Sequence, residues 1–481
     1  MKSSVAGSSL SASNSEWKLV NSGTRMARPL RGAELIVRYA EHYRNGDFQL
    51  VIQASIDTPL TCEQLKKRSP AAWWRTRRAQ PIIALDIDME QASFAPHNTS
   101  EAAKRWASQS CFVATNTSVE EVANTLIRTP SNLSSMTLIV DPARGPRGCI
   151  LNISHTLISL SVYDILHEFI TQLSNPENER GIDAIFSPDF LLDITPRLPQ
   201  SLSHAYSRIH NPSPEDLQAA MAVIQRSQAR FARSTIGVPI HADWKNRPSN
   251  MHNERIAFEP SESRAAFKCF KKLGITLSTA FFACMTSAAA QMFGKGDEEG
   301  AHLLFSGNGR RWVDLGGDGH GPVLMSILPG GLWVEGSDVD IRAKDQDGLA
   351  ALAKAIGHAQ AEDLVSPHII ALYDQMAPAL VKGMAEPVDP APLARLTLTS
   401  QGIFGGGREL EVLDPIRMST FLTGGRCSEG LCFALSSFKG ELLFNMLFDE
   451  RFFVPDELMQ FGHAVAGLFK KFVGDEMQAK L

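Results

Sequence analysis

The chain has 481 residues, enough for two or three ordinary domains or for one large two-lobed unit. Its 44% hydrophobic and 21% charged residues are typical of a soluble globular protein, which at this size folds without disulfides or metals. The formal net charge of −5 offers no electrostatic reason to expect a nucleic-acid partner, for which a clustered basic face would be needed.

The seven cysteines are scattered, and none lies in a CxxC pair or in a Cys/His cluster with zinc spacing. We therefore expect no metal site, and reduced, mostly buried thiols in a cytoplasmic protein. Residues 1–16 are polar, rich in serine and without the apolar core of a secretory signal, so we interpret them as a disordered lead-in. The uncharged segment 273–294 could just span a bilayer, but its several polar residues favour a buried core helix, and we expect no membrane partner.

Helices and strands alternate in the first half of the chain. Hydrophobic spacing predicts helices at 30–43, 60–80, 117–127 and 162–170 and again at 214–234, with strands at 48–56, 82–87, 136–141 and 149–154. Thr61 is the expected cap of the second helix, and Pro81 is expected to end it. Residues 174–214 hold several prolines and no clear period, which indicates a lid or a crossover.

The second half repeats the mixture and adds hairpins. The predicted helices are 261–273, 276–293, 347–363 and 454–472, and the predicted strands are 252–260, 303–310, 323–334, 393–412, 432–438 and 441–449. The last two strands are expected to pair antiparallel. This pattern predicts α/β architecture with mixed sheets flanked by helices in two similar lobes, which we place at 17–215 and 216–481.

Five stretches occur in an order that resembles a known superfamily. They are AAWWRTRRAQPIIAL (71–85), NISHTLIS (152–159), LGITLSTAFFACMTSAAA (273–290), SGNGRRW (306–312) and GELLFNMLFDERFFVPDELMQFGHAVAGLF (440–469). Together they extend over more than four fifths of the chain and resemble the chloramphenicol-acetyltransferase-like superfamily. That group includes BAHD acyltransferases, fungal trichothecene O-acetyltransferases and the condensation domains of peptide synthetases. The resemblance implies an active-site tunnel between two similar lobes.

His155 is the candidate catalytic residue. It follows the predicted strand 149–154 and precedes an amphipathic stretch, where the resemblance places the motif histidine of the family. That histidine removes a proton from an alcohol or amine as the nucleophile attacks a thioester. Histidine suits this role because its pKa lies near neutrality, so that the neutral ring can accept a proton at working pH. The alternative for a single histidine is a hydrogen-bonded interior residue.

The sequence departs from the family at two motifs. HTLIS stands in place of His-x-x-x-Asp, so Ser159 replaces the aspartate, and IFGGG, which begins at Ile403, stands in place of Asp-Phe-Gly-Trp-Gly. In the family these carboxylates are mainly structural, and the first typically pairs with an arginine. The resemblance therefore implies a rebuilt polar scaffold behind His155. Two alternatives remain: Ile403 is misaligned, or Ser159 holds the loop by a neutral hydrogen bond.

Further site residues follow from the resemblance. Ser159, Ser400, Gln401 and Gly405 are candidates to line the tunnel, and Arg310 is expected to be structural. A strand-end hydroxyl such as that of Ser400 can assist an oxyanion, or it can simply be a satisfied polar group. The glycine run that begins at Gly405 lacks the following Lys-Ser/Thr helix of a phosphate loop, which favours a turn.

Three functions fit these observations. The first is acyl transfer in natural-product (secondary) metabolism, from acyl-CoA or a carrier-protein thioester to a hydroxyl or amine of a small molecule. It needs no bound cofactor, and His155 is the general base. The second is a thioester-independent, Diels–Alder-like cyclisation on the same fold, for which proximity and one hydrogen bond can suffice. The third is a non-catalytic binding protein. The resemblance also implies a monomer.

Overall fold

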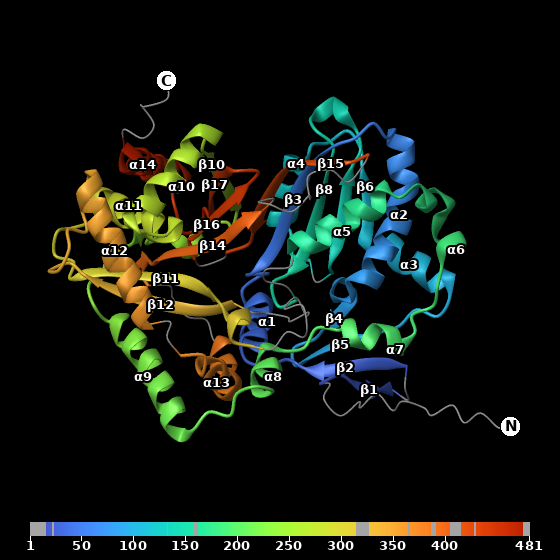
Figure 1. The fold of residues 1–481 in the computed structure, drawn as a ribbon, viewed down its shortest axis with the longest axis horizontal. Helices are drawn as coiled ribbons and strands as arrows, with labels where there is room; N and C mark the ends of the chain where they lie inside the picture. Colours follow the sequence, from blue (N-terminus) through green and yellow to red (C-terminus); the bar gives the residue numbers. More distant parts are fainter. Residues whose placement is uncertain are drawn as a thin grey trace.

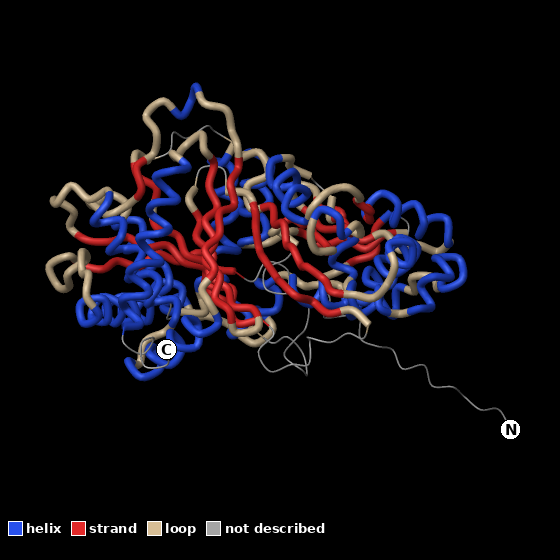
Figure 2. Tube along the Cα trace, turned by 90° about the horizontal axis from the view of Figure 1, so that it is seen from above, coloured by secondary structure: helices blue, strands red, loops and turns tan. Residues whose placement is uncertain are grey.

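The computed structural model describes residues 16–21, 24–131, 133–157, 162–313, 327–363, 366–385, 391–404, 415–427 and 430–474. These residues form two lobes side by side, each built on a β-sheet with helices packed against it (Figure 1). Seen from above, the strands pass through the centre and the helices lie mainly toward the outer sides (Figure 2). The predicted α/β class with two lobes and mixed sheets is confirmed.

The first lobe contains a five-stranded sheet with the order β15-β3-β8-β7-β6. Its strands are β3 (Gln49–Asp57), β6 (Cys111–Ala114), β7 (Ser135–Ile139), β8 (Gly148–Ser154) and β15 (Arg417–Gly425). Only the β6–β7 pair is parallel. By sequence β15 belongs to the predicted second lobe, yet it pairs along its whole length with β3 of the first (Figure 1). This strand, which the sequence analysis missed, joins the two lobes by main-chain hydrogen bonds.

Helices cover this sheet. They are α2 (Cys62–Ala79), α3 (Ser100–Ser110), α4 (Val119–Arg128) and α5 (Val162–Ser174), whereas α1 (Ala33–Tyr43) lies at the foot of β3 between the lobes (Figure 1). Thr61 caps α2 through a reciprocal capping box with Gln64, as predicted. The strand predicted for 82–87 is wrong at its start: the fixed φ of Pro81 opens the 3₁₀-helix η3 (Pro81–Ala84), and β4 (Leu85–Ile87) follows it.

A four-stranded sheet with the order β1-β2-β5-β4 lies beneath the first lobe. Its remaining strands are β1 (Lys18–Val20), β2 (Arg25–Pro29) and β5 (Gln91–Phe94). Buried Arg28 bonds both carboxylate oxygens of Glu34, and Glu16 accepts hydrogen bonds from the amide and hydroxyl of Ser201. Glu16, the last residue of the predicted lead-in, is therefore buried, whereas residues 1–15 lie outside the described residues.

The second lobe contains a six-stranded sheet with the order β10-β17-β16-β14-β11-β12. The strands are β10 (Met251–Ala257), β11 (Gly300–Asn308), β12 (Ile327–Glu335), β14 (Leu396–Phe404), β16 (Cys432–Phe438) and β17 (Glu441–Asp449). β14 runs parallel to both of its neighbours, and the other pairs are antiparallel. The predicted hairpin of the last two strands is confirmed.

The helices of the second lobe include α10 (Pro260–Leu273), α11 (Leu277–Met292), α12 (Gln346–Asp363) and α14 (Pro455–Val473). α11 is buried almost all round within the main apolar cluster, so the prediction of a core helix is confirmed. Among the described residues no single helix is long and apolar enough to cross a bilayer. α10 and α11 meet that test only together, and they are bent by 98° where they join.

The segment predicted to be irregular contains short helices instead. They are η5 (Pro176–Arg180), α6 (Gly181–Ile185), α7 (Leu191–Ile194), η6 (Thr195–Arg197) and α8 (Leu202–Ser207), and the longer α9 (Pro214–Arg230) follows them. α13 (Ile369–Met384), which was not predicted, contacts α1, α8 and α9. The remaining elements are η4 (Pro142–Arg144), η7 (Trp244–Asn246), η8 (Gly309–Trp312) and the short pair β9 (Val238–Pro239) with β13 (Leu393–Ala394).

His302 is expected to make the stability of the protein depend on pH. It lies in β11 with 0% exposure, edge-on to Phe231, at 4.5 Å between ring centroids. Burial, reinforced by Arg395 and Arg230, lowers the pKa of His302 from 6.5 to about 4. At pH values between about 4 and 6.5, His302 is therefore protonated in the unfolded chain but neutral in the folded chain. Because the unfolded chain binds more protons, the free energy of unfolding should rise with pH across this range.

We expect His302 to contribute about 2–3 kcal/mol to the difference in unfolding free energy between pH 4.5 and pH 7. Urea unfolding of the wild type and of His302→Gln at both pH values measures this contribution. The glutamine variant should lose that part of the pH dependence, whatever its absolute stability. An unchanged pH dependence would show that His302 does not titrate as its burial requires.

Candidate active site

His155 lies directly after β8, at the point where the strand turns toward α5. Its side chain is half-buried and its Nδ1 atom is buried. The β3–β8 register pairs Gln49 with Ser154, and the next main-chain bond joins the His155 N–H to the Phe48 carbonyl at 3.1 Å. The strand-end position predicted from the sequence is therefore where the structure places this residue.

The turn at His155 is held by the side chain of Ser154. The Ser154 Oγ donates to Glu41 Oε2 at 2.7 Å and accepts from the Thr156 N–H at 3.1 Å. The Leu157 N–H donates to the Ser154 carbonyl, also at 3.1 Å, and closes the turn. Both flanks of His155 are thus fixed by hydrogen bonds to one serine.

Glu41 brings a carboxylate to this turn from helix α1, 113 residues away in sequence from Ser154. It is 4% exposed and accepts from Arg38 Nη1 at 3.1 Å. Burial raises the pKa of Glu41, while Ser154 and Arg38 act in the opposite direction. The residue that the family motif would supply, Ser159, lies outside the described residues. In the part of the chain that the structure describes, the carboxylate of Glu41 supports the His155 turn through Ser154.

An aromatic ring packs against His155. The ring of Phe48 lies edge-on to the imidazole, with the centroids 6.4 Å apart and the planes at 80°. This is one of the two arrangements that the charge distribution of aromatic rings favours. Phe48 is 41% exposed, so an apolar surface adjoins the candidate base.

Arg310, the predicted structural arginine, is half-buried in η8, immediately after β11. Its amide donates to Asn308 Oδ1 at 3.0 Å, which caps the turn. Burial lowers the pKa of Arg310, and the carboxylate of Asp164 acts against this shift. Asp164 lies in the first turn of α5, the helix that follows His155. The arginine of the second lobe is therefore within electrostatic reach of the helix after the His155 turn.

Ser400 and Gln401 belong to strand β14. The register of its pairing with β16 shifts between Ser400 and Gly402, which marks a bulge. A bulge of this kind bends a strand and is common beside active sites. Because β14 runs parallel to β11, these residues and Arg310 share one end of the sheet. Their side chains and Gly405 lie outside the described residues, so their place in the tunnel stays a prediction.

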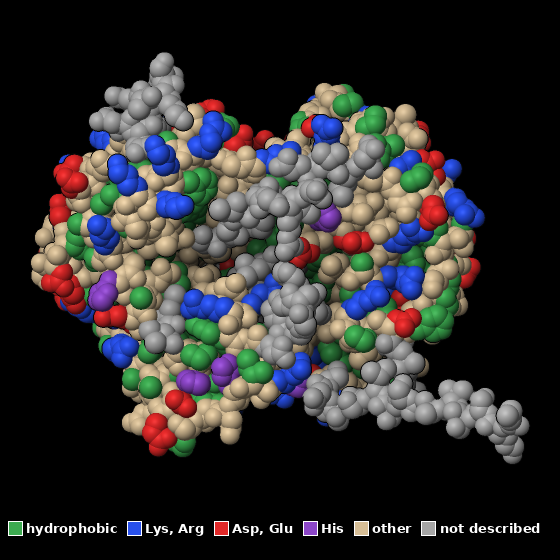
Figure 3. Space-filling model, in the orientation of Figure 1, with side chains coloured by type: hydrophobic (Ala, Val, Ile, Leu, Met, Phe, Trp, Pro, Cys, Tyr) green, Lys and Arg blue, Asp and Glu red, His purple; other side chains and the backbone are tan. Residues whose placement is uncertain are grey.

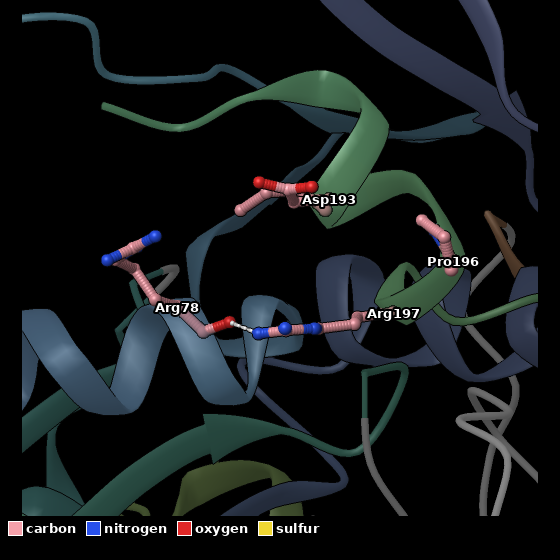
Figure 4. A pocket seen from close by; sticks show the side chains of 5 residues that line it. Arg78, Asp193, Pro196 and Arg197 are labelled. Carbon is pink, nitrogen blue, oxygen red and sulfur yellow. Dashed lines mark hydrogen bonds between the residues drawn. The ribbon is translucent and has the colours of Figure 1, made fainter. Parts of the chain in front are cut away.

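A separate cavity of about 400 Å³ lies in the first lobe between the end of α2, α7 and η6. Arg78, Asp193, Ile194, Pro196 and Arg197 line it, and Arg197 Nη1 donates to the Arg78 carbonyl at 3.0 Å (Figure 4). None of the predicted site residues lines this cavity. We therefore do not assign it to the chemistry of His155.

Other kinds of site find little support among the described residues. They contain no group of three or more His, Cys, Asp or Glu side chains that could hold a metal ion. All seven cysteines are free, and burial raises the pKa of Cys149 to about 12 and that of Cys432 to about 11, which suppresses the thiolate. Lys and Arg are interspersed with Asp and Glu on the face in Figure 3.

The sequence analysis did not identify Glu41, Phe48 or Ser154 as parts of the site. It predicted strands at 48–56 and 149–154, so the nearest available signal was that Phe48 begins one predicted strand and Ser154 ends the other. Nothing in the local pattern of α1 distinguishes Glu41 from other helical carboxylates. Its role depends on a contact between distant segments.

The comparisons with known proteins agree with this fold. No family model matches the chain. The acyl-CoA-dependent acyltransferase MAC2 of Pseudozyma antarctica is 26% identical, in an alignment that covers 94% of this chain and 97% of that protein. The TRI3 trichothecene 15-O-acetyltransferase of Fusarium sporotrichioides superposes with a TM-score of 0.77 over 95% of this chain and 98% of its own, at 16% identity.

A peptide-synthetase domain shows the same architecture. The first condensation domain of the calcium-dependent antibiotic synthetase superposes with a TM-score of 0.62 at 12% identity, over 94% of this chain and 97% of its own. Both structural likenesses extend over nearly the whole chain. The chain thus has the chloramphenicol-acetyltransferase-like fold that the order of its motifs predicts.

Proposed function

We propose that the protein is an acyltransferase of secondary metabolism that moves an acyl group from a thioester to a hydroxyl or amine of a small molecule. The similarity to the acyl-CoA-dependent acyltransferase MAC2 along almost the entire chain supports this most strongly. We take acyl-CoA as the thioester and as a co-substrate, without a bound cofactor. A carrier-protein thioester is the alternative donor. We further propose a monomeric, cytoplasmic enzyme.

The geometry supports His155 as the general base. A base must be held where the substrate proton will lie, and hydrogen bonds through Ser154 and Phe48 hold the turn of His155. Because Nδ1 is buried, we assign proton transfer to Nε2. The partly exposed Phe48 ring beside it offers an apolar surface next to the imidazole.

The reaction that follows is a simple acyl transfer. As the acceptor oxygen or nitrogen attacks the thioester carbonyl, its proton passes to His155 Nε2 and a C–O or C–N bond forms. The tetrahedral intermediate then collapses, the C–S bond breaks, and the imidazolium returns the proton to the leaving thiolate. The chain regains neutral His155, and the products are the acylated acceptor and free thiol.

Thiol release is the experimental test. Purified protein is incubated with acetyl-CoA and longer acyl-CoA donors and a panel of hydroxylated and amine natural products, and free CoA and acylated product are quantified together. Equal amounts of the two support the proposal. Conversion of a single substrate to a cyclised isomer without any thioester would instead establish the cyclase. Binding of acceptors without turnover of any donor or substrate would establish the non-catalytic alternative.

A further inference from the structure

The turn before β3 holds a bulky residue in a backbone conformation that L-residues rarely adopt. Phe48 has a φ of 67°, and Asn45 and Gly46 just before it have φ values of 52° and 79°. Asparagine and glycine tolerate this left-handed region, whereas phenylalanine is strained there. Such strain persists only where the surroundings impose it, and it concentrates at functional sites.

The surroundings of Phe48 impose this conformation from two sides. Its N–H donates to the Arg426 carbonyl at 3.1 Å, and its own carbonyl accepts from the His155 N–H at 3.1 Å. Arg426, which follows β15, is 5% exposed and donates from its amide to the Gln49 carbonyl at 2.8 Å and from Nε to the Asn45 carbonyl at 3.1 Å. The crossing strand of the second lobe thus locks the turn from one side, and the candidate base lies on the other.

Held by these hydrogen bonds, Phe48 contacts His155 in two ways. The carbonyl of Phe48 fixes the histidine main chain, and the ring lies edge-on to the imidazole. The ring is nevertheless 41% exposed, so its burial in the core does not account for the strain. The strained backbone of Phe48 directs both its ring and its carbonyl toward His155.

We propose that Phe48 is a positioning residue for His155, held by the strained turn so that its ring limits the imidazole to the orientation that accepts the substrate proton. This inference rests on the proposed role of His155 in acyl transfer. It predicts that loss of the ring affects the chemical step more than substrate binding, because the ring acts on the base and not on the thioester.

Phe48→Gly separates positioning from stability. Glycine adopts a φ of 67° without strain, so the unfolding midpoint should not fall, yet kcat should fall about 10- to 100-fold with little change in KM for the thioester. Phe48→Tyr keeps the ring and should retain most of kcat. Lys439→Gly is the matched control, because Lys439 has a φ of 50° in the exposed turn between β16 and β17. It should relieve similar strain without changing kcat.

The outcomes separate the two proposals. A wild-type kcat in Phe48→Gly, or a kcat in Phe48→Tyr as low as in the glycine variant, overturns the inference while acyl transfer stands. If the wild type lacks thioester turnover, the proposed function fails, and crystal structures of the wild type and Phe48→Gly then decide the positioning role. If His155 has the same single rotamer in both structures, the positioning role is overturned. If His155 is displaced or has several rotamers in Phe48→Gly, the positioning role is supported. Phe48→Asn, which also tolerates positive φ, replaces the glycine variant if that variant does not fold.

Discussion

Replacing His155 with alanine is expected to lower kcat for thioester-dependent acyl transfer by about 10²–10⁴-fold, the range that a positioned general base contributes. The imidazole is half-buried at the end of β8, and the main-chain bond to Phe48 does not require the side chain. The fold should therefore survive the change. Steady-state kinetics at saturating thioester, with the thermal midpoint as the fold control, give the measurement.

His358→Ala is the matched control for this experiment. His358 lies in α12 with its side chain 80% exposed, paired only loosely with Glu362 at 3.3 Å. Its loss should change neither kcat nor the thermal midpoint. If His155→Ala retained the kcat of the His358 control, His155 would be a structural histidine and the proposed mechanism would be wrong.

Glu41→Ala is expected to lower both stability and catalysis. Removing one partner of a buried ion pair costs about 3–5 kcal/mol. We expect a value near the lower limit, about 3 kcal/mol, because Arg38 keeps its bond to the Asp88 carbonyl. The Ser154 hydroxyl loses its acceptor at the same time, so the turn that carries His155 loosens and kcat should fall about tenfold or more.

Two further variants separate these effects. Glu41→Gln keeps an oxygen that can accept from Ser154, and should restore most of kcat while remaining less stable than the wild type. Ser154→Ala removes the bond to the turn but leaves the Arg38–Glu41 pair, and should lower kcat with a smaller loss of stability. Equal kcat values in all three variants and the wild type would mean that Glu41 supports the fold alone. Urea unfolding and steady-state kinetics on the same preparations provide both readouts.

Local patterns predicted the elements whose composition or spacing is typical of their type. The uncharged α11, the amphipathic α14 and the β16–β17 hairpin are recognisable without their neighbours, because each has the spacing or turn residues of its type. β15 and α13 were missed because each contains residues that locally indicate a break. β15 ends in two glycines, and it forms a strand through its antiparallel pairing with β3. α13 contains Pro378, which locally indicates a break in a helix.

The sequence analysis named His155 as the candidate base, but it did not name the residues that hold its turn. His155 became the candidate because the resemblance places the family's motif histidine after a strand and before an amphipathic helix, and the structure shows that order of elements. The supports of His155 could not be identified, because Glu41 and Arg426 reach the turn from distant segments and Phe48 depends on a backbone conformation that no residue pattern announces. Long-range contacts, and not local propensity, determine how the base is held.

A crystal structure with CoA and an accepted acceptor tests the central claim most directly. The account predicts that the acceptor hydroxyl or amine lies about 3 Å from His155 Nε2, with the CoA sulfur close enough that an acyl carbon bonded to it would lie next to the acceptor atom. CoA bound elsewhere, for example in the cavity beside Arg78 and Arg197, with no acceptor in reach of His155, would contradict it.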